Sequence, residues 1–215
     1  LVYPSSLSLR AQSTNTPASI GKGRVALGPT INTSYHEVAP IITPDGRTLF
    51  FHRFFHPANV GGVDGGEDVW VSVLNADLMW GEPCNVGPPL NTMGNNFVTS
   101  VSPDGKTLYL GNVYNQDGTL AGGLSRSRRD GDSWSFPEPV RITGFRNFAT
   151  RSFFSISADG KTMILEIDNA ESFGMDDLYV SFAGPDGIWS RPVNLGPVIN
   201  TPGREITPYL APDGR

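Results

Sequence analysis

The segment Thr43-Pro44-Asp45-Gly46-Arg47-Thr48-Leu49 decides the fold, because it returns at nearly constant intervals along the chain. Pro presets φ at the second turn position, Asp accepts hydrogen bonds from the nearby backbone, and Gly takes the left-handed conformation that closes a hairpin. The Asp residues of successive copies lie 59, 55 and 54 positions apart, which indicates structural repeats of about 55 residues. The other copies are Ser102-Pro103-Asp104-Gly105-Lys106-Thr107-Leu108, Ser157-Ala158-Asp159-Gly160-Lys161-Thr162-Met163 and Ala211-Pro212-Asp213-Gly214-Arg215.

Three further sequence series keep the same register. A Trp-x-x-Pro motif begins at Trp80, Trp134 and Trp189. A Leu/Val-Gly-Pro-x-Ile/Leu-Asn-Thr motif covers 27–33, 86–92 and 195–201, and an apolar segment precedes each Trp at 68–72, 124–127 and 177–181. Four series in one register establish internal repetition, in which the turn residues have a structural role.

Each repeat is predicted to contain four antiparallel strands. In the first repeat, strand a covers 37–43, strand b 48–54 and strand c 68–73, and strand d begins near Trp80. Four-stranded units repeated head to tail are typical of β-propeller blades, so we predict an all-β β-propeller of four-stranded antiparallel blades. The expected organisation is a disordered leader at 1–24 and blades over 25–215, in repeats at about 34–92, 93–147, 148–201 and, in part, 202–215. About three and a third repeats predict an incomplete propeller, and therefore a fragment of a longer protein.

Differences in repeat length predict which face binds a ligand. From the turn to the following Trp there are 36 residues in the first repeat and 31 in each of the next two, and the extra residues fall in the b–c loop at 55–66. In an up-and-down blade the b–c loops and the d–a crossovers share one face, whereas the Pro-Asp-Gly turns lie on the other. Variable loops are commonly the binding loops, so we expect a ligand on the crossover face.

Composition excludes several classes of protein. The 25 Gly and 18 Pro residues are spread between apolar runs, as expected for many turns and short strands. A net charge of −5 without a dense basic patch argues against nucleic-acid binding. No apolar run reaches the length of a transmembrane helix, and the single Cys84 allows no internal disulfide.

The turn motif followed by an aromatic strand resembles the WD40-like repeat called PD40, found in TolB-type propellers. The longer pattern, with Leu-Gly-x-x-Ile-Asn-Thr and Glu-Asp-Val-Trp-Val-Ser, is similar to PD40 arrays of bacterial cell-envelope proteins and extends over 27–215. The resemblance implies an exported protein in the periplasm or at the cell surface, associated with the outer membrane. It also implies additional domains in the full-length protein, often OmpA-like ones.

Eight polar residues are candidate binding residues. Three of them occupy equivalent positions on the inner strands, and the others lie in or beside the b–c loops. The inner-strand candidates are Glu37, Arg151 and Glu205, and the loop candidates are His56, Asp64, Glu67, Asp117 and Glu171.

We expect no catalytic residues, no cofactor and no resident metal. Calcium is the alternative for two acidic loops, because hard cations prefer several oxygen ligands. The favoured interpretation is that Asp68 and Asp177 cap the start of strand c. The acidic residues concerned are Asp64, Glu67 and Asp68 in the first loop, and Asp168, Glu171, Asp176 and Asp177 in the second.

The leading functional hypothesis is a non-catalytic exported propeller module that binds an envelope protein or a glycan. The first alternative is the propeller of a polysaccharide-acting enzyme, with Glu37 and Glu205 as its acids. The second is the propeller of a serine peptidase whose catalytic part is missing, since no Gly-x-Ser-x-Gly segment occurs in the chain. A third is a calcium-stabilised, lectin-like module.

Overall fold

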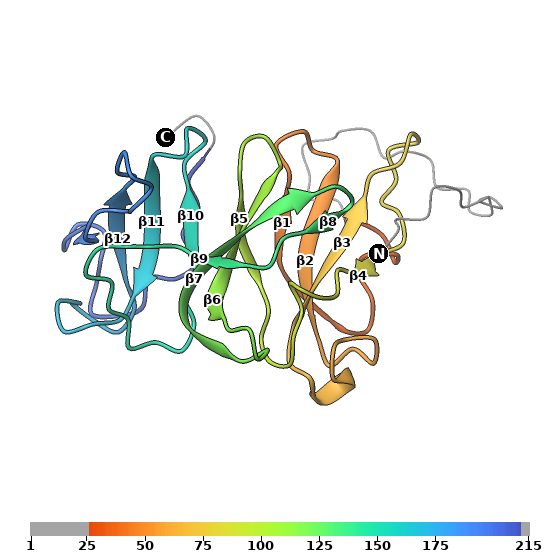
Figure 1. The fold of residues 1–215 in the computed structure, drawn as a ribbon, viewed down its shortest axis with the longest axis horizontal. Helices are drawn as coiled ribbons and strands as arrows, with labels where there is room; N and C mark the ends of the chain where they lie inside the picture. The colour runs from red at the N-terminus through yellow and green to blue at the C-terminus, as the bar shows by residue number, and fades with distance from the viewer. Residues whose placement is uncertain (1–25, 212–215) are drawn as a thin grey trace.

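The computed structural model describes residues 26–211, which form three antiparallel sheets in chain order. Figure 1 shows the sheets side by side. Within each sheet, the strands pair in the order of the sequence. The first sheet consists of β1 (His36–Ile42), β2 (Thr48–Phe54), β3 (Asp68–Val73) and β4 (Cys84–Asn85). The second consists of β5 (Val98–Val101), β6 (Thr107–Tyr114), β7 (Leu120–Asp130) and β8 (Ser133–Trp134), with β9 (Glu138–Pro139) also paired to β7. The third consists of β10 (Phe154–Ile156), β11 (Thr162–Ile167), β12 (Asp177–Phe182) and β13 (Val193–Asn194).

The prediction of an all-β architecture with four-stranded antiparallel blades is confirmed. The helical structure within 26–211 is a single 3-10 turn, η1 (Gly62–Asp64). The predicted strands b and c of the first repeat coincide with β2 and β3. The predicted leader at 1–24 lies outside the described residues, as do Pro212, Asp213 and Gly214 of the last turn.

Strand d begins later than its Trp suggested. Trp80 makes only an isolated bridge to Leu74, and β4 starts at Cys84. Pro83 has no N–H to donate to the ladder, and it separates the bridge from the strand. The outermost strand of the first and third sheets is therefore only two residues long.

The a–b turns are closed by side-chain hydrogen bonds. Asp45 Oδ1 accepts from Thr43 Oγ1 at 2.6 Å and from Arg47 N at 3.0 Å, while Gly46 has φ 71° and donates to Thr43 O. The same pattern recurs around Asp104 and Asp159. The neighbouring hydroxyls, followed by the backbone N–H groups, lower the pKa of each of these carboxyls.

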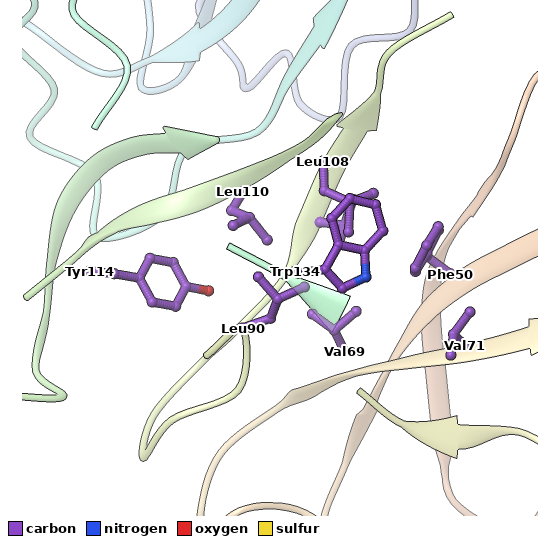
Figure 2. Packing of buried hydrophobic residues seen from close by; sticks show 9 residues of the cluster. Phe50, Val69, Val71, Leu90, Leu108, Leu110, Tyr114 and Trp134 are labelled. Atoms are coloured by element: carbon purple, nitrogen blue, oxygen red, sulfur yellow. The ribbon is translucent and has the colours of Figure 1, made fainter. Parts of the chain in front are cut away.

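The core lies between the sheets, because the middle strands are buried on both faces. On β2, Leu49 and Phe51 pack into one cluster while Phe50 packs into another. The cluster between the first and second sheets is drawn in Figure 2, where Phe50 faces the Trp134 indole across the interface. Strands that are buried on both faces have nearly continuous apolar sequences. The labelled residues of this cluster are Phe50, Val69, Val71, Leu90, Leu108, Leu110, Tyr114 and Trp134.

The Trp residues of the repeats close the interfaces between blades. Trp134 makes an edge contact with Phe50 of the preceding sheet, with ring centroids 6.1 Å apart. Trp189 belongs to the second interface, in a cluster that also contains Leu124 of the second sheet and Tyr179 of the third. Their repetition therefore reflects packing of one blade on the next.

Polar bonds also join neighbouring blades. His52 Nε2 accepts from Val98 N at 2.9 Å, and Glu166 Oε2 accepts from Thr207 N at 3.0 Å. His52 is fully buried, and burial, assisted by the charge of Arg151, lowers its pKa to about 3. A neutral imidazole therefore accepts the bond from Val98 throughout the physiological pH range.

The b–c loops and the crossovers lie at the same end of the sheets. Gly94 N donates to Gly65 O and Asn96 N to Glu67 O, each at 2.8 Å, so the first crossover is bonded to the first b–c loop. The a–b turn is bonded instead to the c–d connection, through Leu74 N and Arg47 O. The end with the b–c loops is called the crossover face below. Within the part of the chain that the structure describes, no helix has the length and apolar character needed to cross a membrane.

Candidate binding face

In two of the crossovers, an asparagine side chain makes the hydrogen bonds to strand c that the backbone of a neighbouring strand would make. Asn91 accepts from Val69 N and donates to Val69 O, both at 2.9 Å, so its amide pairs with β3 as a neighbouring peptide group would. Asn200 makes the same two bonds to Leu178 at the same distances. Both asparagines are almost fully buried, which makes these bonds costly to lose.

The acids at the start of strand c fix the b–c loops. Asp68 Oδ2 accepts from Val60 N at 2.7 Å and from Asn85 Nδ2 at 2.6 Å, and Asp177 makes corresponding bonds to Phe173 N and Asn194 Nδ2. Burial raises the pKa of Asp68. Within residues 26–211, no group of three or more His, Cys, Asp or Glu side chains has an arrangement suited to a metal ion.

Glu37 and Glu205 brace the crossovers that precede them. Glu37 accepts from the Thr33 hydroxyl at 2.5 Å and from the Thr33 N–H at 3.1 Å, and Glu205 does the same with Thr201 at 2.6 and 3.0 Å. Glu37 also pairs with the buried Arg53. The oxygens of both candidate acids are thus engaged by the protein itself.

Three loop candidates lie in separate places. His56 packs between Tyr35 and Trp70, with ring centroids 4.4 and 4.5 Å apart, and burial lowers its pKa. Asp64 is exposed in η1. Asp117 lies in the tight hairpin between β6 and β7, where its carboxylate accepts from the Thr119 hydroxyl and N–H. The structure does not bring these three residues together.

Glu67 and Arg151 form an ion pair between residues 84 positions apart. Glu67 is fully buried, whereas the Arg151 side chain is one-third exposed and its guanidinium lies 4.6 Å from the Phe97 ring centroid and 5.3 Å from that of Phe153. Burial raises the pKa of Glu67 to about 7, against the opposing effect of Arg151. The pair links the first b–c loop to the start of the third blade.

Glu67 is expected to make stability depend on pH near neutrality. Its carboxyl takes up protons more readily in the folded chain than in the unfolded chain, so its contribution to stability falls as pH rises from about 4.5 to about 7. The loss amounts to at most about 3.5 kcal/mol. Thermal melting should show the wild type losing stability relative to Glu67→Gln between pH 5 and pH 8.

The control for the pH experiment is Glu138→Gln, which removes a carboxylate from an exposed surface pair. The stability difference between the wild type and Glu67→Gln should change with pH. The difference between the wild type and Glu138→Gln should change much less. A wild-type minus Glu67→Gln difference that stays constant from pH 5 to pH 8 would contradict the raised pKa.

The crossover between the second and third blades, residues 142–152, lacks the strand-like asparagine. Its anchor is Asn147, which donates to Ser152 Oγ at 2.7 Å and accepts from Ala149 N and Asp168 N. Phe148 N donates to Asp168 O at 2.7 Å. Asn147 is half-buried, whereas Arg146 and Phe148 on either side of it are exposed.

Two adjoining hollows on the crossover face share Arg146 and Phe148; together they are called the crossover groove below. One has a volume of about 370 Å³ and the other about 320 Å³. The first is also lined by Asn169, Glu171 and Arg191, and the second by the β7 backbone at 122–123. Of the eight predicted binding residues, only Glu171 lines this groove.

A smaller hollow of about 210 Å³ adjoins the groove at Ala149. It is lined by Arg151 and Arg204, together with the buried Glu166. Arg204 pairs with Asp176 at 2.5 Å, and burial raises the pKa of Glu166. Both arginines at this hollow therefore already have a carboxylate partner.

Sequence reasoning did not single out Arg146, Asn147, Phe148 or Glu166. The signal for the first three was present, because 142–150 is the one internal crossover without the Leu-Gly-Pro-x-Ile-Asn-Thr pattern. The signal for Glu166 was a single acid inside the apolar strand β11.

Comparison with known proteins supports the fold. No family model matches the chain, and no curated protein matches it. TolB from Acinetobacter baumannii is similar in structure, with a TM-score of 0.53 and 16% identity over 86% of this chain and 37% of TolB. The fold is that of a β-propeller. The chain spans little more than a third of the length of TolB.

Two weaker similarities are with enzymes. A structure from a study of two prolyl endopeptidases has a TM-score of 0.42 and 16% identity, over 84% of this chain and 24% of that one. The periplasmic gluconolactonase of Pseudomonas aeruginosa has a TM-score of 0.36 and 16% identity, over 74% of this chain and 56% of that one.

Proposed function

We propose that the chain is a non-catalytic propeller module that binds a cell-envelope ligand in the crossover groove. The observation that carries this proposal is the contrast between the crossovers. Two are fixed by Asn91 and Asn200, whereas the third presents Arg146 and Phe148 to solvent beside the two hollows. Exposed side chains on a firmly held backbone are typical of binding sites.

The non-catalytic character is supported by the hydrogen bonds that the two candidate acids make within the protein. Glu37 and Glu205 each accept two bonds from the crossover that precedes them, which accounts for their presence as parts of the scaffold. The envelope location, in the periplasm or at the cell surface, is supported by the resemblance of the turn motif to PD40 repeats. The same resemblance supports further blades or domains in the whole protein.

Co-sedimentation of the purified chain with an insoluble bacterial cell-envelope fraction tests the proposal. We expect the wild type to be retained, and an Arg146→Ala/Phe148→Ala variant to be retained at least about tenfold less, because several contacts are lost together. The variant should melt at the wild-type temperature, because both side chains are exposed. Retention that does not change in the variant would overturn the groove as the binding site.

The enzymatic alternative is decided in the same incubation. Release of soluble sugar or peptide from the envelope fraction by the wild type, abolished in Glu37→Gln/Glu205→Gln, would establish catalysis in place of binding alone.

A further inference from the structure

We infer that the ligand of the crossover groove is an acidic polysaccharide, whose sugar rings pack on Phe148 and whose carboxylates pair with Arg146. This inference rests on the proposed function, and it names the class of ligand.

Phe148 provides a flat apolar surface in the groove. Its side chain is 67% exposed, although its backbone is held by the bond to Asp168 O and by the neighbouring Asn147. The face of an aromatic ring carries partial negative charge, so it attracts the weakly positive C–H groups on one side of a pyranose ring. A ring held on a bonded backbone loses little freedom when a ligand binds.

Arg146 supplies a cation that has no counter-ion within the described residues. Its side chain makes no ion pair or hydrogen bond among residues 26–211, whereas Arg191, on the same wall, pairs with Glu171 at 2.5 Å. Arg146, Arg191 and Glu171 together give the groove a local charge of +1, on a chain with a net charge of −5. An unpaired guanidinium suits a carboxylate, which it binds through two parallel hydrogen bonds.

The other lining groups suit sugar hydroxyls. Asn169 Oδ1 accepts from Tyr179 Oη at 3.0 Å and from Glu171 N at 2.7 Å, which holds the amide in place. Its Nδ2 group makes no hydrogen bond within the described part of the chain. A fixed amide with a spare donor is the kind of polar group that orients a hydroxyl-rich ligand.

An acidic peptide is disfavoured by the backbone of the groove. Peptides commonly bind by adding a strand to an open sheet edge, and the groove is lined by β7 backbone at 122–123, just before the segment of β7 that pairs with β9. There the register of β7 against β6 shifts between Gly111 and Val113, and Gly123 has φ 140°. Such a bulge breaks the regular spacing of N–H and C=O groups that a strand would need.

Calorimetric titration of the purified chain with defined oligomers tests the inference. The probes are hexagalacturonate and hexamannuronate, the methyl ester of each, and hexaglutamate, all at 150 mM salt. We expect at least one uronate to bind, while its methyl ester and hexaglutamate bind at least tenfold more weakly. Arg146→Ala should weaken uronate binding about 10- to 100-fold, as expected for the loss of a charge-assisted hydrogen bond.

Arg47→Ala is the matched control, because it removes an exposed arginine from the a–b turns at the other end of the first sheet and should leave binding unchanged. Failure of both uronates to bind overturns the inference. Equal binding of the methyl ester, or hexaglutamate binding as tight as the uronates, overturns it as well. If uronates fail while envelope retention still depends on Arg146 and Phe148, the proposed function stands and only the ligand class is wrong.

Discussion

Leu90→Ala is expected to lower the free energy of unfolding by about 3 kcal/mol. Leu90 is 0% exposed, and it belongs to the cluster between the first two sheets, where it lies beside Val69 (Figure 2). Removing three buried carbon atoms from this interface costs their transfer to water and leaves a cavity between two sheets. Equilibrium urea unfolding would measure the change.

Ile199→Ala is the matched control, because Ile199 occupies the same position in the Gly-Pro-x-Ile/Leu-Asn-Thr motif but is 49% exposed. Its replacement should cost less than half as much as that of Leu90. Equal effects at the two positions would mean that Leu90 does not act through the packing of blade on blade.

Asn91→Asp is expected to destabilise the chain by about 3 kcal/mol. The carboxylate keeps an acceptor for Val69 N, but it has no N–H to donate to Val69 O and Asn85 Oδ1. It would also place a charge at a fully buried position next to acceptor atoms. Urea unfolding at pH 7.5 would measure the loss, and part of it should be recovered at acidic pH, where the new carboxyl is protonated.

Asn32→Asp is the control for this change. Asn32 fills the same motif position, but its side chain is exposed, so the substitution should alter stability by no more than about 0.5 kcal/mol. A large effect at Asn32, or a negligible one at Asn91, would contradict the strand-like role of the asparagine amide.

Much of the fold followed from the sequence, because its strongest signals are local. The turn residues Thr43 to Gly46 bond to one another, so their chemistry is visible in one short segment. Strand d was placed less well, since a two-residue strand such as β4 has little pattern of its own and its start depends on the bridge at Trp80.

The candidate site was harder to predict for a physical reason. Charge and repetition pointed to Glu37 and Glu205, yet repeated polar residues also serve the scaffold, and these two brace the crossovers. The Glu67–Arg151 pair joins two loops through tertiary structure that no spacing in the sequence reveals. The most useful signal was a missing pattern, because the crossover that lacks the common motif presents Arg146 and Phe148.

The polar bonds between blades have a consequence for how such arrays change over time. In the His52–Val98 and Glu166–Thr207 hydrogen bonds, the earlier blade supplies the accepting side chain. The later blade contributes only a backbone N–H group. Every amino acid except proline supplies that group, and the two bonds indeed use residues as different as Val98 and Thr207. At these two interfaces the bond is therefore indifferent to the side chain of the residue that donates it, which leaves the donating blade free to change its side chain there.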